Sequence, residues 1–132
     1  MAKPYYEFFC PVKVIAGNAA LEHIPFELAT LGAKRPLIIT DKGVRANGLL
    51  NPIEAAFSTT DAVIGHVFDD VPPDSSLEVV RLAAEAYRKN KCDAIIAVGG
   101  GSVIDTSKAT NILVSEGGDD LLQYSGAHNL PK

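Results

Sequence analysis

This sequence of 132 residues has no excess of positive charge, no long apolar run and only two cysteines. A formal net charge of -4 and a pI near 5.3 provide no basic field for a polyphosphate backbone, so we expect no nucleic acid partner. No stretch approaches the ~20 apolar residues that span a bilayer, and the amino terminus lacks a signal-like apolar run. We therefore expect a cytoplasmic protein without a membrane partner.

The cysteines give no sign of a metal site or a disulfide. Cys10 and Cys92 are far apart and in no metal-ligand spacing, and we expect both to be reduced residues in strand-rich neighbourhoods. An apolar content of 47% is enough to bury one hydrophobic core in a chain of this length. The sequence therefore predicts a single domain over residues 1–132.

Periodicity and turn signals predict alternating strands and helices. Aromatic and β-branched residues at 5–9 and 12–16 favour two short strands or one broken hairpin. Continuous apolar runs typical of strands buried on both faces occur at residues 35–40, 62–68 and 94–98. Helical patterns occur at residues 19–31, 49–57, 77–90 and 103–114. This order predicts a Rossmann-like α/β fold, with a parallel sheet, helices on both faces and an amino-terminal β-hairpin or edge strand.

Local signals refine the predicted helices. Pro25 is awkward inside the first helix, so we expect its opening turn to be irregular or the helix to begin at that proline. Ser75 followed by Glu78 is a capping-box pattern at the start of the third helix. The stripe that should face the sheet from that helix consists of Val80, Ala83, Ala84 and Tyr87. A short helix at best is expected at 119–124.

A run of three glycines follows the last buried strand. Gly99, Gly100 and Gly101 let the backbone approach a ligand closely, and Ser102 stands where a hydroxyl and free helix N–H groups would face an anion. A tight turn without a ligand needs only one glycine. The glycine run is not a Walker loop, because the Lys of that motif is absent. It is not the Rossmann fingerprint GxGxxG either, because Ile104 occupies the position of the last glycine. The pattern predicts a loop that binds phosphate or pyrophosphate.

Three separated segments resemble the iron-containing (group III) alcohol dehydrogenase family. AIIAVGGGSVIDTSKA resembles its signature of an apolar strand, GGGS and a helix with Asp and Lys. LIITDKG resembles its first nucleotide-fold strand with the following Asp, and FDDVPPDSS resembles its V-x-P-[ND] turn. The resemblance runs from about residue 8 to about residue 130, and Ser102 favours this branch over glycerol dehydrogenases and dehydroquinate synthases.

The resemblance implies the NAD(P)-binding part of an enzyme that transfers a hydride between a nicotinamide cofactor and a small alcohol or aldehyde. It places residues 100–105 along the pyrophosphate and nicotinamide side of the cofactor, and Asp74 near its adenosine end. Many relatives have Asn at that position, and the alternative is that Asp74 only forms a turn. For Lys108, an ion pair with Asp105 is the favoured interpretation. The predicted cofactor-binding residues are Asp41, Asp74, Gly99, Gly100, Gly101, Ser102, Val103, Ile104 and Asp105.

Asp41 predicts which nicotinamide cofactor is preferred. It ends a buried strand, where a carboxylate accepts hydrogen bonds from the adenosine ribose and repels the 2′-phosphate of NADP. We therefore expect NAD to be preferred, with NADP weaker. Lys42 should offset only part of this repulsion, because an exposed lysine is mobile and screened. The alternative is that Asp41 only caps the turn that follows.

The resemblance also implies a divalent metal, usually Fe²⁺, that belongs to the full-length enzyme. In the family this Lewis acid is held by one Asp and three His of a helical carboxyl-terminal domain. His23, His66 and His128 are scattered, so we predict no metal ligand and no catalytic residue in this chain. The family's second cofactor loop is expected just after Pro131. We therefore expect a fragment that is inactive alone, the alternative being a freestanding, non-catalytic nucleotide- or phosphate-binding module.

The amino-terminal segment also predicts the oligomeric state. Relatives often dimerise through their amino-terminal strands, and residues 5–9 have the apolar and aromatic content of an edge that prefers a partner. We therefore expect a homo-oligomer.

Overall fold

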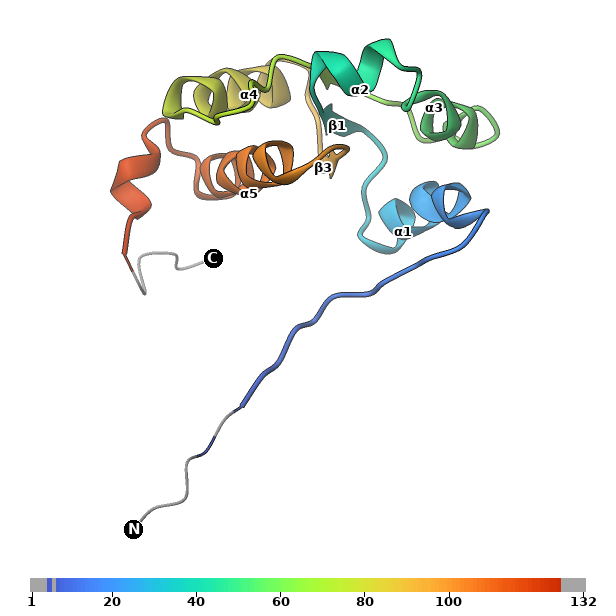
Figure 1. The fold of residues 1–132 in the computed structure, drawn as a ribbon, viewed down its shortest axis with the longest axis horizontal. Helices are drawn as coiled ribbons and strands as arrows, with labels where there is room; N and C mark the ends of the chain where they lie inside the picture. Colours follow the sequence, from blue (N-terminus) through green and yellow to red (C-terminus); the bar gives the residue numbers. More distant parts are fainter. Residues whose placement is uncertain (1–4, 6, 127–132) are drawn as a thin grey trace.

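A parallel three-stranded sheet lies between two helical layers (Figure 1). The computed structural model describes residue 5 and residues 7–126. The strands, in the spatial order β2-β1-β3, are β1 (Pro36–Ile39), β2 (His66–Phe68) and β3 (Ala94–Ala97). The helices are η1 (Ala20–His23), α1 (Ile24–Thr30), α2 (Lys42–Ala46), α3 (Asn51–Phe57), α4 (Leu77–Lys89), α5 (Gly101–Glu116) and η2 (Leu121–Tyr124). The predicted parallel α/β sheet is confirmed.

Successive residues of the central strand face opposite helical layers, because side chains alternate along a strand. Ile38 packs in the cluster that contains residues of α1 and α3. Leu37 and Ile39 pack on the other face, in the cluster that contains residues of α4 and α5. All three are completely buried, and burying an apolar side chain of this size contributes about 1.5–3 kcal/mol. The continuous apolar run is thus explained by helices on both faces.

Helices α4 and α5 lie side by side (Figure 1). Val80 and Ala84 of α4 contact Leu113 of α5 in a small buried cluster. The face of α5 that is buried also contains Thr106 and Thr110, whose hydroxyls each donate 2.8 Å hydrogen bonds to the carbonyl four residues earlier. These bonds satisfy the hydroxyls locally, so the two threonines are buried without losing a hydrogen-bond partner.

The Asp93 carboxylate links the starts of β1 and β3 at one edge of the sheet. Asp93, just before β3, accepts backbone hydrogen bonds from Lys34 at 2.8 Å and from Arg35 at 2.7 Å, just before β1. Because it bridges two consecutive N–H groups, it fixes the register in which β1 and β3 pair. Lys34 also forms a 2.8 Å ion pair with Asp61, in the segment that leads to β2.

Residues 7–16 differ from the prediction of paired strands. They are extended but unpaired and run away from the folded body (Figure 1). Phe8 and Phe9 are 91% and 82% exposed, so the β propensity of this segment finds no partner within the described residues. A strand needs a neighbouring strand as well as suitable residues, and no edge of the sheet lies alongside. Lys13 forms an ion pair with Glu27 of α1.

Proline and aspartate residues explain where the observed α1, β2 and α2 agree with or differ from the ranges predicted from the sequence. Pro25 lies in the first turn of α1 and a 3-10 turn precedes it, which confirms the irregular start. Strand β2 is shorter than the predicted 62–68, because Pro36 opposite it has no N–H to donate, although its carbonyl accepts from Gly65 at 2.8 Å. Helix α2 is not predicted by the sequence and begins after its cap, Asp41.

Both cysteines are free thiols. Cys92 is buried beside the sheet, whereas Cys10 is exposed in the unpaired segment, so its predicted strand-rich surroundings are wrong. Within the part of the chain that the structure describes, no helix is both long and apolar enough to cross a membrane.

Candidate functional site

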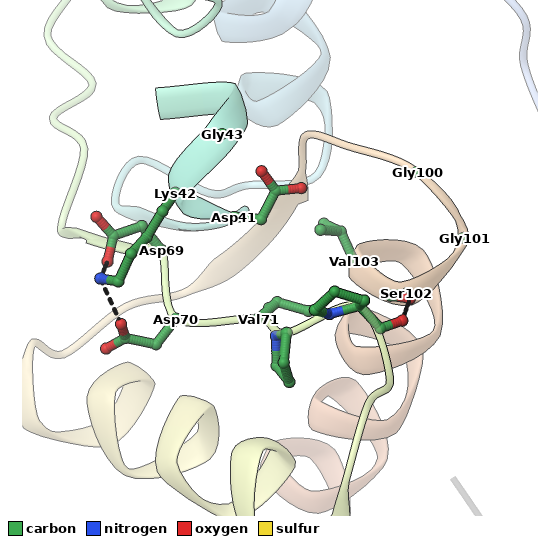
Figure 2. A pocket seen from close by; sticks show the side chains of 12 residues that line it. Asp41, Lys42, Gly43, Asp69, Asp70, Val71, Gly100, Gly101, Ser102 and Val103 are labelled. Atoms are coloured by element: carbon green, nitrogen blue, oxygen red, sulfur yellow. Dashed lines mark hydrogen bonds and ion pairs between the residues drawn. The ribbon is translucent and has the colours of Figure 1, made fainter. Parts of the chain in front are cut away.

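The strands end at a cavity of about 630 Å³ (Figure 2). Its wall consists of residues 41–43 after β1, residues 69–73 after β2 and residues 100–103 at the start of α5. All strands of a parallel sheet end at the same edge, so segments far apart in sequence converge there. The cavity therefore lies beyond the carboxyl ends of the strands, where parallel α/β sheets bind ligands.

The glycine loop turns sharply from β3 into α5. At Gly99 φ is +155°, and a Cβ added there would lie 2.7 Å from Cγ2 of Val103, so this position requires glycine. A Cβ on Gly100 or Gly101 would meet no atom within 4 Å. Packing within the described chain therefore explains one of the three glycines, as the sequence argument predicts. The other two leave the backbone open on the cavity wall.

The first turn of α5 directs backbone donors toward the cavity wall. Its N-cap is Gly100, which has no side chain to accept these hydrogen bonds, and the first intrahelical bond runs from the Ile104 N–H to the Gly100 carbonyl at 3.0 Å. The N–H groups of residues 101–103 come before that bond, and a helix provides no partner for them. The dipole of this 16-residue helix adds partial positive charge at the same end. Such an end is suited to bind a phosphate.

Ser102 lies on the cavity wall, and its hydroxyl holds that wall together. The hydroxyl donates to the carbonyl of Pro73 in the loop after β2. A second bond links the same segments, since the hydroxyl oxygens of Ser75 and Thr106 lie 2.6 Å apart. Thr106 donates its own hydrogen to the Ser102 carbonyl, so Ser75 is the donor to Thr106. In this structure the Ser102 hydroxyl thus positions the loop after β2 against α5.

The N-cap of α4 is not the predicted Ser75, because the Ser75 hydroxyl bonds to Thr106 of α5. Ser75 is occupied with α5, and Ser76 caps α4 by accepting from the Val79 N–H at 3.3 Å. Glu78, the predicted partner within the box, forms an ion pair with Arg81 at 2.6 Å.

Asp41 lies on the cavity wall and caps α2. Its Oδ1 accepts from the Val44 N–H at 2.8 Å, so the capping contact of the alternative interpretation is present. Within the described residues no hydrogen bond engages Oδ2, which remains available for a ligand. The buried Thr40 next to it donates to the Val98 carbonyl at 2.7 Å and ties the ends of β1 and β3 together. Capping and ligand binding by Asp41 are therefore compatible.

Charged side chains of α2 meet those of the loop after β2 beside this cavity. The Lys42 amino group lies 2.7 Å from Asp70 and 3.5 Å from Asp69, and Arg45 contacts Asp69 at 2.8 Å. The hydrogen bond to Asp70 and the two negative charges raise the pKa of Lys42. The hydrogen bond from Arg45 lowers the pKa of Asp69. Figure 2 shows the Lys42 amino group between these carboxylates and away from that of Asp41. Neither Asp69 nor Asp70 is among the residues predicted from the sequence, although their position directly after β2 is the available signal.

Four predicted site residues are not part of the cavity wall: Asp74, Gly99, Ile104 and Asp105. Asp74 is exposed in a bend of the loop after β2. Ile104 and Asp105 lie on the exposed side of α5, and Ile104 is 42% exposed. Asp105 and Lys108, both within the described chain, do not form the predicted ion pair.

The histidines lie on separate elements. His23 belongs to η1 and His66 to β2, whereas His128 lies outside the described residues. Among the residues that the structure describes, no group of three or more His, Cys, Asp and Glu side chains is arranged to hold a metal ion.

Comparison with known proteins gives a consistent set of matches. The family model described as iron-containing alcohol dehydrogenase matches residues 11–132. A 4-hydroxybutyrate dehydrogenase of Cupriavidus necator is 38% identical over 100 residues, which are 76% of this chain and 25% of that protein. The structure of an NADH-dependent butanol dehydrogenase A from Thermotoga maritima matches with a TM-score of 0.83 at 25% identity, covering 97% of this chain and 32% of that one. A sulfoacetaldehyde reductase from Bifidobacterium kashiwanohense, solved in complex with NAD⁺, matches with a TM-score of 0.82 at 26% identity, covering 96% of this chain and 32% of that one. The chain thus spans about a third or less of the length of these proteins.

Proposed function

Since this chain belongs to the iron-containing alcohol dehydrogenase family, we propose that it is a single nucleotide-binding domain whose cavity binds NAD. For the complete enzyme we propose hydride transfer between NAD and a small alcohol or aldehyde. One observation carries the proposal, namely that two glycines without a packing role lie at the open amino terminus of a 16-residue helix, on a cavity wall. The pyrophosphate of a dinucleotide is an anion that suits this arrangement.

The proposal assigns a task to each part of the cavity. Gly100 and Gly101 let the pyrophosphate approach the backbone, and the N–H groups of residues 101–103 donate to it. Oδ2 of Asp41 accepts from a ribose hydroxyl, while Oδ1 keeps the cap of α2. When bound, NAD supplies the carbon that accepts or donates the hydride, and the residues of this chain bind and orient it.

The relatives support NAD as the dinucleotide. One similar structure is that of an NADH-dependent enzyme and another contains NAD⁺. The family name implies iron as well, but among the described residues no group of three or more His, Cys, Asp and Glu side chains could hold a metal ion. We expect no turnover by these residues alone. Roles for Asp74, Gly99, Ile104 and Asp105, which are not part of the cavity wall, stay predictions.

Titration calorimetry with NAD tests the proposal directly. Gly101→Val places a side chain in the open space where the pyrophosphate should approach, since a Cβ added at Gly101 meets no atom within 4 Å. NAD binding should weaken at least about tenfold, or ~1.4 kcal/mol, while the unfolding temperature stays close to that of the wild type. Ala29→Val, on an exposed position of α1, is the matched control and should bind NAD normally. A wild-type chain that does not bind NAD, or a Gly101→Val variant that binds it equally well, would contradict the proposal.

We also propose a homo-oligomer in the cytoplasm. Four apolar side chains of the unpaired segment are more than half exposed, namely Phe8, Phe9, Val12 and Val14. An extended apolar segment of this kind gains burial and backbone hydrogen bonds when it pairs with a second chain.

A further inference from the structure

Lys42 and Arg45 both follow Asp41 along the chain, and both form ion pairs with the loop after β2. The amino group of Lys42 lies 2.7 Å from Oδ1 of Asp70 and 3.5 Å from Oδ1 of Asp69. Arg45 Nη1 lies 2.8 Å from the other oxygen of Asp69, Oδ2. The two carboxylates therefore engage the cations that stand closest in sequence to Asp41.

This restraint matters because the Lys42 side chain is long and 73% exposed. Without carboxylate partners, its amino group would be free to sample the space beside Asp41 on the same cavity wall. An ammonium group is a compact charge that binds phosphate readily. A released Lys42 would therefore be ready to attract an additional phosphate near the ribose.

We propose that Asp70, together with Asp69, determines cofactor specificity by holding Lys42 away from the 2′-phosphate position of a bound dinucleotide. This inference rests on the proposed NAD function and adds a second determinant beside Asp41. Asp41 repels the 2′-phosphate directly, whereas Asp70 withholds the cation that would offset this repulsion. Asp70 also adds its own negative charge to the wall.

Asp70 is the better of the two aspartates to change. Its side chain is 60% exposed and pairs with Lys42, whereas that of Asp69 is 21% exposed and holds both Lys42 and Arg45. Asp70→Asn removes the charge with little change in shape, so the fold should be retained. Thermal unfolding of each variant checks this point.

The experiment compares the Kd values for NAD and NADP by calorimetry at low salt. In Asp70→Asn the ratio of the NADP Kd to the NAD Kd should fall about three- to fivefold, the contribution of a partly screened ion pair. Adding Lys42→Ala should return the ratio to the wild-type value or above it. Asp61→Asn is the matched control, because it frees Lys34 from a 2.8 Å ion pair at the opposite edge of the sheet. Its ratio should equal that of the wild type.

The outcomes separate this inference from the proposed function. If the wild type binds NAD and Asp70→Asn leaves the ratio unchanged, or shifts it no more than Asp61→Asn does, the inference is overturned and the proposed function stands. A ratio that stays low in the double variant would overturn the role of Lys42. If the wild type binds neither dinucleotide, the proposed function itself is overturned.

Discussion

Replacing Gly99 with alanine should destabilise the chain, whereas the same change at Gly101 should not. At Gly99 φ is +155°, a conformation that L side chains rarely adopt. The new Cβ would lie 2.7 Å from Cγ2 and 3.0 Å from Cβ of Val103. Val103 is only 2% exposed and packs in the cluster that contains Leu37 and Ile39 of the central strand. At Gly101 the new Cβ would meet nothing within 4 Å.

The size of the effect follows from two costs. Overpacking a well-packed core costs about 1–3 kcal/mol. Holding a residue other than glycine in a sparsely populated backbone region costs about 1–3 kcal/mol more. The sum, roughly 2–6 kcal/mol, is a large part of the ~5–15 kcal/mol that stabilises a typical domain. At about 3–5 °C per kcal/mol for a chain of this size, the unfolding temperature should fall by roughly 6–30 °C.

Thermal unfolding followed by far-ultraviolet circular dichroism measures this difference. Gly101→Ala is the control and should remain within about 1 kcal/mol of the wild type. Combining Gly99→Ala with Val103→Ala should cost less than the two single changes together, because truncation of Val103 removes the clash. A Gly99→Ala variant as stable as Gly101→Ala would refute the account of the loop given above.

Three further predictions concern selectivity, acid stability and assembly. Asp41→Gly should shift calorimetric affinities toward NADP relative to NAD, and a wild type that prefers NADP, or an unchanged ratio, would remove Asp41 from the proposed site. Since Arg45 lowers the pKa of Asp69 below its ordinary value of 3.8, the pair stabilises the fold above that pH, and this contribution is lost as the pH falls through the folded-state pKa. Urea unfolding below about pH 4 should therefore show the wild type losing its advantage over Asp69→Asn, and an advantage that persists would contradict this reasoning. Light scattering at roughly tens of micromolar should show an oligomer that Phe8→Asp weakens, whereas a wild-type monomer would argue against pairing through residues 7–16.

The strands and the glycine loop are predictable from the sequence because their signals are local. Strands β1 and β3 fall within the predicted ranges 35–40 and 94–98, since a continuous apolar run is what two covering layers require. The turn into α5 is likewise encoded by neighbouring residues, with Gly99 fitting where Val103 leaves no room for a side chain.

The features that sequence reasoning misses depend on which segments become neighbours. Ser75 and Ser76 are equally good caps by residue type, and the choice is made by Thr106, which engages Ser75 from another helix. The ion pairs of Lys42 exist only because β2 lies beside β1, a pairing that local patterns do not specify. Residues 7–16 show the converse, because their β propensity is evident but a strand also needs a partner.

The Asp93 carboxylate, which accepts hydrogen bonds from the N–H groups of Lys34 and Arg35, lies at the edge of the sheet opposite the cavity. This contribution to strand alignment lies where no ligand is proposed to bind, so it does not depend on the loops that line the cavity. Exposed positions of those loops, such as Asp70 and Gly101, can then change in sequence, in evolution or in protein engineering, without moving the strands that carry them. A change in the nucleotide that this sheet binds should thus require new loops at the cavity, whereas Asp93 at the opposite edge should stay unchanged.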